Sequence, residues 1–127
     1  METEALARRL AELADSKGAT EILALDMRGL VSYTDFLVIC TGRNERQAAA
    51  IRDEVSLRLK REESLLPRQV EGGPQGGWVV LDYLDCVLHV FTPETRDRYR
   101  LEQLWADAPR LELGLAGEAI ERRAARA

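Results

Sequence analysis

Histidine, cysteine and aromatic residues are scarce in this sequence. The 127 residues include one His, two Cys, and only 6% Phe, Trp and Tyr. A single His gives no imidazole cluster for a metal, and Cys40 and Cys86 form no CxxC or Cys/His pattern. Both cysteines lie in apolar runs, where a free thiol usually behaves as a small buried hydrophobe. We therefore expect no metal and no cofactor.

A basic excess and a long apolar run are also missing. The 18 Lys and Arg residues stand against 22 Asp and Glu, so the net charge is −4. That balance argues against a strongly nucleic-acid-binding surface and suits a basic protein partner. The apolar runs are too short to span a bilayer, and the acidic start does not resemble a signal peptide. We expect a cytoplasmic protein with little direct nucleic-acid contact and no membrane contact.

The hydrophobic pattern predicts a domain of helices and strands. Apolar residues recur at helical spacing over residues 3–17 and about 45–62, and Asn44 with Gln47 resembles a capping box before the second helix. Thr92-Pro93-Glu94 starts a third helix that reaches Trp105. Short apolar runs predict strands at 21–26, 36–40, 67–71 and, as a hairpin, within 78–91. We therefore predict an α/β (α+β) fold with a mixed five-stranded sheet and helices packed on it.

The hairpin within residues 78–91 is the most informative segment. Folded with a two-residue loop at Leu84 and Asp85, its side chains alternate between two faces. One face is almost entirely apolar and should pack on the core: Val79, Leu81, Tyr83, Cys86, Leu88 and Val90. The other face is mixed: Trp78, Val80, Asp82, Val87, His89 and Phe91. Such a mixed face is typical of a recognition surface, or of a sheet covered by a helix with Asp82 and His89 paired to each other or to backbone.

No group of residues predicts catalysis. His89 and Cys86 point to opposite faces of the hairpin, and no spacing makes Asp82, Asp85 and His89 converge on an ion. The loop at 41–44 precedes a helix, where backbone N–H groups can hold an anion. It has no Walker or GxGxxG pattern, and a helix cap explains it better. We predict that the protein is not an enzyme.

Several short motifs coincide in their order and spacing. They are Ile22–Asp26, Asp35–Gly42, Arg46–Ala48, Glu71–Gly72, Trp78–Tyr83, His89–Phe91 and Arg96–Trp105. Over about residues 4–107 they resemble the ribosomal silencing factor family, also called the Iojap-like family. The resemblance implies a nucleotidyltransferase-like topology. It also implies a domain at 1–107, which leaves 108–127 as a C-terminal extension that is weakly helical or disordered.

The resemblance implies a function as well. Family members are translational repressors that bind the large ribosomal subunit through a ribosomal protein of the intersubunit face. They block subunit joining sterically, and they can form homodimers. The implied contact region matches Trp78, Asp82, Tyr83 and Asp85, whose acidic residues would meet a basic ribosomal protein. Leu84 stands where the family often has Gly, and Leu would be strained at the positive φ that Gly commonly serves. Either the turn is of another type or the loop is longer than two residues, and Leu84 would also offer an exposed apolar contact.

Two alternatives stay open. A nucleotide-binding or nucleotidyl-transfer enzyme on a related fold would need paired carboxylates beside a phosphate loop. Asp26 and Asp35 are separate in the sequence, and no such loop is present. A generic homodimeric adaptor would show itself by concentration-dependent sedimentation without ribosomes.

Overall fold

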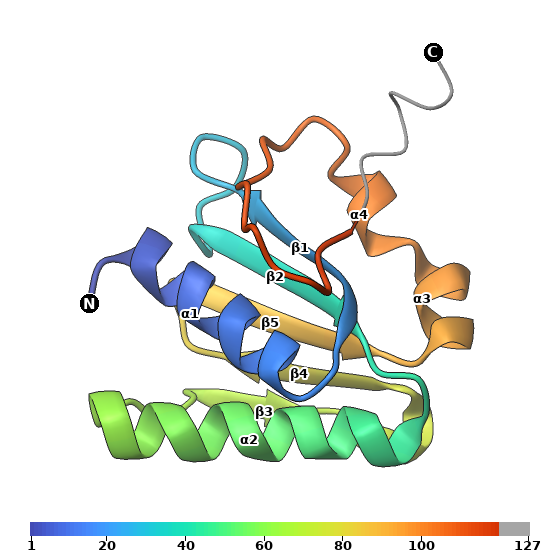
Figure 1. The fold of residues 1–127 in the computed structure, drawn as a ribbon. Helices are drawn as coiled ribbons and strands as arrows, with labels where there is room; N and C mark the ends of the chain where they lie inside the picture. The colour runs from blue at the N-terminus through green and yellow to red at the C-terminus, as the bar shows by residue number, and fades with distance from the viewer. Residues whose placement is uncertain (120–127) are drawn as a thin grey trace.

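A computed structural model describes residues 1–119 of the chain. Helices alternate with strands, as the hydrophobic pattern predicted (Figure 1). The elements are α1 Thr3–Ser16, β1 Thr20–Asp26, β2 Phe36–Thr41, α2 Glu45–Glu63, β3 Gln69–Glu71, the 3-10 turn η1 Pro74–Gly76, β4 Trp78–Asp82, β5 Cys86–Phe91, α3 Pro93–Tyr99 and α4 Leu101–Leu104.

The five strands form one mixed sheet in the order β1-β2-β5-β4-β3. The central strands β2 and β5 are parallel, and the other three pairs are antiparallel. This confirms the predicted mixed five-stranded sheet; the nucleotidyltransferase-like topology stays a prediction. β3 is a short edge strand, in keeping with the proline just before it.

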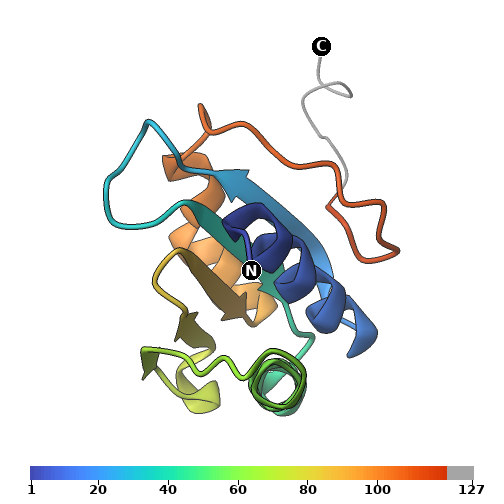
Figure 2. The same cartoon turned by 90° about the vertical axis from the view of Figure 1, so that its left-hand side faces the viewer.

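The sheet separates two layers of apolar packing. Helices α1 and α2 lie on one side of it and α3 lies on the other (Figures 1 and 2). Leu10 of α1 and Ile51 and Val55 of α2 belong to the larger core cluster. On the second side Leu37 and Phe91 pack with partly buried Trp105. Burial on both sides explains why every residue of β2 is buried and why its sequence is continuously apolar.

Helix α2 begins as the capping pattern predicted. The Asn44 side chain accepts a hydrogen bond from the Gln47 amide over 2.8 Å. In return, the Gln47 side chain accepts one from the Arg43 amide over 2.7 Å. These bonds satisfy amides at the helix start that lack a partner within the helix.

The prediction of one continuous helix from Pro93 to Trp105 is wrong. The helix stops at Arg100, whose φ of 47° lies in the left-handed region, and α4 adds a single turn after it. The guanidinium of Arg96 lies across this break. It donates to the Glu102 carboxylate over 3.2 Å and to the Thr41 hydroxyl over 2.8 Å. Long-range contacts therefore hold a bend that local helix propensity does not indicate.

The segment after α4 lies extended along the outer edge of β1. The Leu111 amide donates to the Ala24 carbonyl and the Ala119 amide to the Ile22 carbonyl, each over 2.9 Å. Leu111 and Leu113 pack against the larger core cluster. Residues 116–119 belong to the extension expected to be weakly helical or disordered, and they form no helix because their backbone bonds to β1; residues 120–127 lie outside the described residues. The domain boundary at 107 stays a prediction, and these bonds favour a later one.

Within residues 1–119, no helix combines the length and apolar character that crossing a bilayer requires.

Candidate functional site

The hairpin has the predicted register. Trp78 pairs with Phe91, Val80 with His89 and Asp82 with Val87. The Tyr83 amide donates to the Cys86 carbonyl over 2.9 Å, which closes a two-residue loop. The predicted apolar face is buried in the larger core cluster, so the mixed face points to the side of α3.

The turn keeps a leucine where glycine would be easier to accommodate. Leu84 has φ of 75°, and the Asp85 amide donates to the Tyr83 carbonyl across it over 2.9 Å. The Asp82 carboxylate accepts a hydrogen bond from the Leu84 amide over 2.7 Å. The Leu84 side chain is 48% exposed. The loop is therefore not longer than two residues; it keeps Leu84 at a positive φ and presents an apolar side chain to solvent.

The Asp82 carboxylate accepts hydrogen bonds from residues close to it in the structure. Its second carboxylate oxygen accepts a hydrogen bond from Arg68 over 2.9 Å, and the side chain is 13% exposed. Burial alone would raise the pKa of Asp82, but the hydrogen bonds from Arg68 and from the Leu84 amide outweigh it and lower the pKa. Asp82 thus stays ionised and stabilises the turn. The neighbouring Asp85 is exposed.

Trp78 and His89 form a hydrogen bond on the mixed face. The indole Nε1–H donates to Nδ1 of His89 over 3.0 Å, so this imidazole nitrogen carries no proton. Burial lowers the pKa of His89 to about 4, although the charge of Asp82 acts in the opposite direction. Of the two pairings considered for Asp82 and His89, to each other or to backbone, Asp82 takes a backbone partner, the Leu84 amide, and His89 bonds to the Trp78 side chain instead.

Tyr99 completes an aromatic cluster around Trp78. The Trp78 ring lies 4.9 Å from the Phe91 ring and 4.8 Å from the Tyr99 ring, between centroids. The Gly77 carbonyl accepts hydrogen bonds from the Thr92 amide and the Thr95 hydroxyl, which ties the start of β4 to the start of α3. Tyr99 is 52% exposed. Sequence reasoning placed Tyr99 on a helix without assigning it to the site, because only the tertiary packing of α3 brings it to Trp78.

We call the part of the sheet beside this cluster the open face. It comprises the residues of β3, β4 and β5 that share the side of α3 and are not fully buried: Gln69, Glu71, Trp78, Val80, Asp82, Val87 and His89. Those on β4 and β5 are half-buried and those on β3 are exposed. Trp78 and Asp82 belong to this face, and Leu84 with Asp85 forms its tip.

Tyr83 does not belong to the open face. Its side chain points to the opposite side of the sheet, where it joins the larger core cluster and is 6% exposed. Its hydroxyl is buried without a hydrogen-bond partner among the described residues. Burial raises the pKa of Tyr83 to about 12. The structure therefore brings four of the five predicted contact residues to one surface and leaves the fifth beneath the turn.

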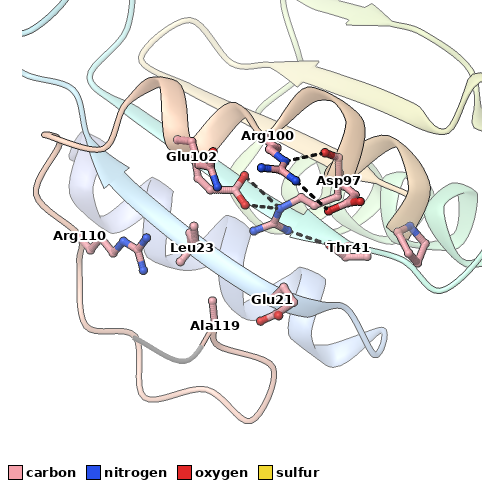
Figure 3. Close-up of a pocket in the computed structure, with 11 residues that line it drawn as sticks. Glu21, Leu23, Thr41, Asp97, Arg100, Glu102, Arg110 and Ala119 are labelled. Atoms are coloured by element: carbon pink, nitrogen blue, oxygen red, sulfur yellow. Dashed lines mark hydrogen bonds and ion pairs between the residues drawn. The ribbon is translucent and has the colours of Figure 1, made fainter. Parts of the chain in front are cut away.

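A cleft of about 450 Å³ lies between β1, α3, α4 and the C-terminal segment (Figure 3). The Arg100 and Asp97 side chains lie next to each other in it (Figure 3). Arg96 is engaged by Glu102 and Thr41, as described above. The cleft thus holds internally paired charges. Within residues 1–119, no three His, Cys, Asp or Glu side chains converge as a metal site would require.

Comparisons with known proteins agree with this architecture. The sequence profile of a family described as "Ribosomal silencing factor during starvation" matches residues 1–127. "Ribosomal silencing factor RsfS" of Halalkalibacterium halodurans is 37% identical over 113 residues, which cover 89% of this chain and 96% of that protein. "Mitochondrial assembly of ribosomal large subunit protein 1" of Mus musculus is 31% identical over 101 residues, which cover 76% of this chain and 43% of that protein.

A crystal structure from Chromobacterium violaceum has a similar fold. It superposes with a TM-score of 0.79 and 29% identity, covering 95% of this chain and 98% of that chain. Sequence and fold thus point to one family over most of the chain. The chain belongs to the ribosomal silencing factor family.

Proposed function

We propose that the chain represses translation by binding the large ribosomal subunit through a basic ribosomal protein of the intersubunit face. Bound there, it blocks joining of the small subunit. The observation that carries the proposal is the open face with its aromatic edge, formed by half-buried Trp78 and exposed Tyr99. The family's name and the name of the mouse relative, which mentions the large subunit, support this choice of partner.

The aromatic edge supplies the binding energy in this proposal. Trp and Tyr are enriched among residues that dominate protein interfaces, because they bury a large area with few rotatable bonds. The Trp78 ring is held by His89, Phe91 and Tyr99 before any partner arrives. Less side-chain entropy is then lost on binding, which favours affinity.

Asp85 provides the charge that meets a basic partner. It is exposed at the tip of the hairpin, whereas the Asp82 carboxylate is already bonded to Arg68 and the Leu84 amide. An exposed charge at the rim of an interface acts mainly on the rate of association and on orientation. We assign Leu84 an apolar contact beside Asp85. Tyr83 supports the turn from below.

The mechanism is steric and needs no chemistry from the chain. A folded domain seated on the subunit interface occupies space that the small subunit requires. Relatives carry the names of silencing factors rather than of enzymes, which fits a non-enzymatic role. The proposal implies a location in the cytoplasm, where ribosomes work, and it leaves room for a homodimer in the free protein.

Sedimentation with purified ribosomal subunits tests the proposal. We expect the wild-type chain to sediment with large subunits and not with small subunits. Tyr99→Ala should weaken that association by about tenfold or more, as truncation of an interface hot spot does, and Asp85→Lys should weaken it mainly by slowing association. Both side chains are exposed, so thermal unfolding should change little.

Matched controls come from α2 on the other side of the sheet. Leu57→Ala removes an exposed apolar side chain, and Asp53→Lys reverses an exposed charge. Both variants should bind like the wild type. Wild-type binding by folded Tyr99→Ala and Asp85→Lys would overturn the assignment of the open face. Absence of wild-type sedimentation with large subunits would overturn the function itself.

A further inference from the structure

A second surface lies on the side of the molecule away from the open face. It is a hollow of about 340 Å³ between the end of α1 and the start of α2. We call it the basic hollow, and its lining residues are Lys17, Arg43, Asn44, Arg46, Gln47 and Ala50.

Gln47 fixes the walls of the basic hollow. Its side-chain amide donates to the Lys17 carbonyl over 3.0 Å, and its side-chain oxygen accepts from the Arg43 amide over 2.7 Å. Gln47 is buried, so these bonds are shielded from water. Two segments far apart in the sequence are thereby held together, each carrying a basic residue.

The charge of the basic hollow differs from that of the rest of the chain. Lys17, Arg43 and Arg46 line it, and no acidic side chain does. None of these three side chains has an ion pair or a hydrogen bond to another residue of 1–119. By contrast, ion pairs engage most other arginines of that range: Arg8, Arg9, Arg28, Arg52, Arg58, Arg68, Arg96 and Arg100. The basic hollow therefore concentrates positive charge in a chain whose net charge is −4.

We propose that the basic hollow binds phosphate groups of a ribosomal RNA backbone. This inference rests on the proposed function, because it names a second contact of the chain on the large subunit. Exposed Arg and Lys side chains without internal partners are suited to phosphate oxygens, and Arg can donate two parallel hydrogen bonds to one phosphate. The net charge of the chain did not predict this contact, because it does not show where basic residues cluster on the surface.

The lining also indicates how the RNA is recognised. The basic hollow has no aromatic side chain on which an unstacked base could lie. It has no large apolar side chain that would anchor a protein partner. Contacts limited to phosphates fix position and orientation without reading sequence. The basic hollow thus orients the domain on RNA, while the open face on the other side of the sheet binds protein.

The salt dependence of binding tests this inference. Lys17→Gln/Arg46→Gln removes two charges from the basic hollow. Lys60→Gln/Arg61→Gln removes the same two residue types from the far end of α2, where they are exposed and likewise outside the ion pairs of residues 1–119. The affinity of each full-length variant for purified large subunits is measured over a series of salt concentrations. An RNA duplex without protein and polyglutamate serve as competitors.

We expect the Lys17/Arg46 variant to bind large subunits on the order of tenfold more weakly than the wild type at low salt. The slope of log affinity against log salt should become less steep by about 1.5. The Lys60/Arg61 variant should match the wild type, and the RNA duplex should compete better than polyglutamate. Three results would overturn the inference: an unchanged slope for the first variant, an equal loss in the control, or stronger competition by polyglutamate. Failure of the proposed function differs from these, because the wild type would then not bind large subunits at all.

Discussion

The indole N–H of Trp78 donates to Nδ1 of His89 over 3.0 Å, between diagonal positions of β4 and β5. The bond fixes the plane of the indole ring against Phe91 and leaves its outer edge beside Tyr99. A half-buried imidazole thereby holds the largest aromatic side chain of the open face. His89 acts through Trp78 and need not contact a partner.

Replacing His89 should disturb Trp78 according to the hydrogen-bonding capacity of the new side chain. His89→Leu leaves the indole N–H without its acceptor and should lower the free energy of unfolding by about 1–3 kcal/mol. His89→Asn places an oxygen near the position of Nδ1 and should retain part of that energy. Chemical denaturation measures both effects, and Trp78 fluorescence in a Trp105→Phe background reports the indole environment. Equal losses in both variants would contradict a role for the bond.

His89 should also make stability depend on pH. Its folded-state pKa of about 4 lies below the ordinary value of 6.5, so the unfolded chain binds the proton more readily. The contribution of His89 is therefore complete above the unfolded-state pKa and is lost as the pH falls toward the folded-state pKa. The loss amounts to at most about 3 kcal/mol. Unfolding free energies between about pH 7 and about pH 5 should fall less steeply for His89→Asn than for the wild type.

Leu84→Gly should affect the stability of the fold and the binding of large subunits differently. A leucine at φ of 75° is strained by about 1–2 kcal/mol, and glycine removes that strain while losing more entropy on folding. The side chain is half exposed, so little core packing is lost. We expect stability to stay level or rise by up to about 1 kcal/mol. Binding to large subunits should weaken if Leu84 makes the proposed contact. Unchanged binding would remove Leu84 from the contact surface.

Gly117→Ala should loosen the C-terminal segment from β1. A Cβ at this position would lie 2.2 Å from the Ala19 carbonyl oxygen, far closer than van der Waals contact allows. The segment must then shift, which exposes Leu113 and the outer edge of β1, and an exposed edge strand invites pairing with a second chain. We expect a lower unfolding temperature and concentration-dependent association in sedimentation. Ala116→Ser, at an exposed neighbouring position, should change neither quantity.

The hairpin was predictable because side chains alternate with a period of two, so one apolar face fixes the register. The hydrogen-bond partner of His89 was not predictable, because Trp78 and Asp82 both lie diagonal to His89 and the sequence does not distinguish them. The break at Arg100 carries no local signal, since the Arg96 contacts that bridge it reach Thr41 in a distant strand. The pairing of the segment around Leu111 with β1 was not predicted, because that segment was expected to be weakly helical or disordered and its partner strand lies far away in the sequence.

The parallel pairing of β2 with β5 has a consequence for folding. It joins Phe36 to Cys86, which lie 50 positions apart in the sequence. Closing so long a loop costs more entropy than forming the local β4–β5 hairpin, and non-local pairing slows folding. Tyr99 is the last residue of α3, which follows β5 in the chain, so it can contact Trp78 only once both elements have been synthesised. A chain still being synthesised is therefore expected to lack the aromatic edge, so that only finished copies of the protein become competent to bind.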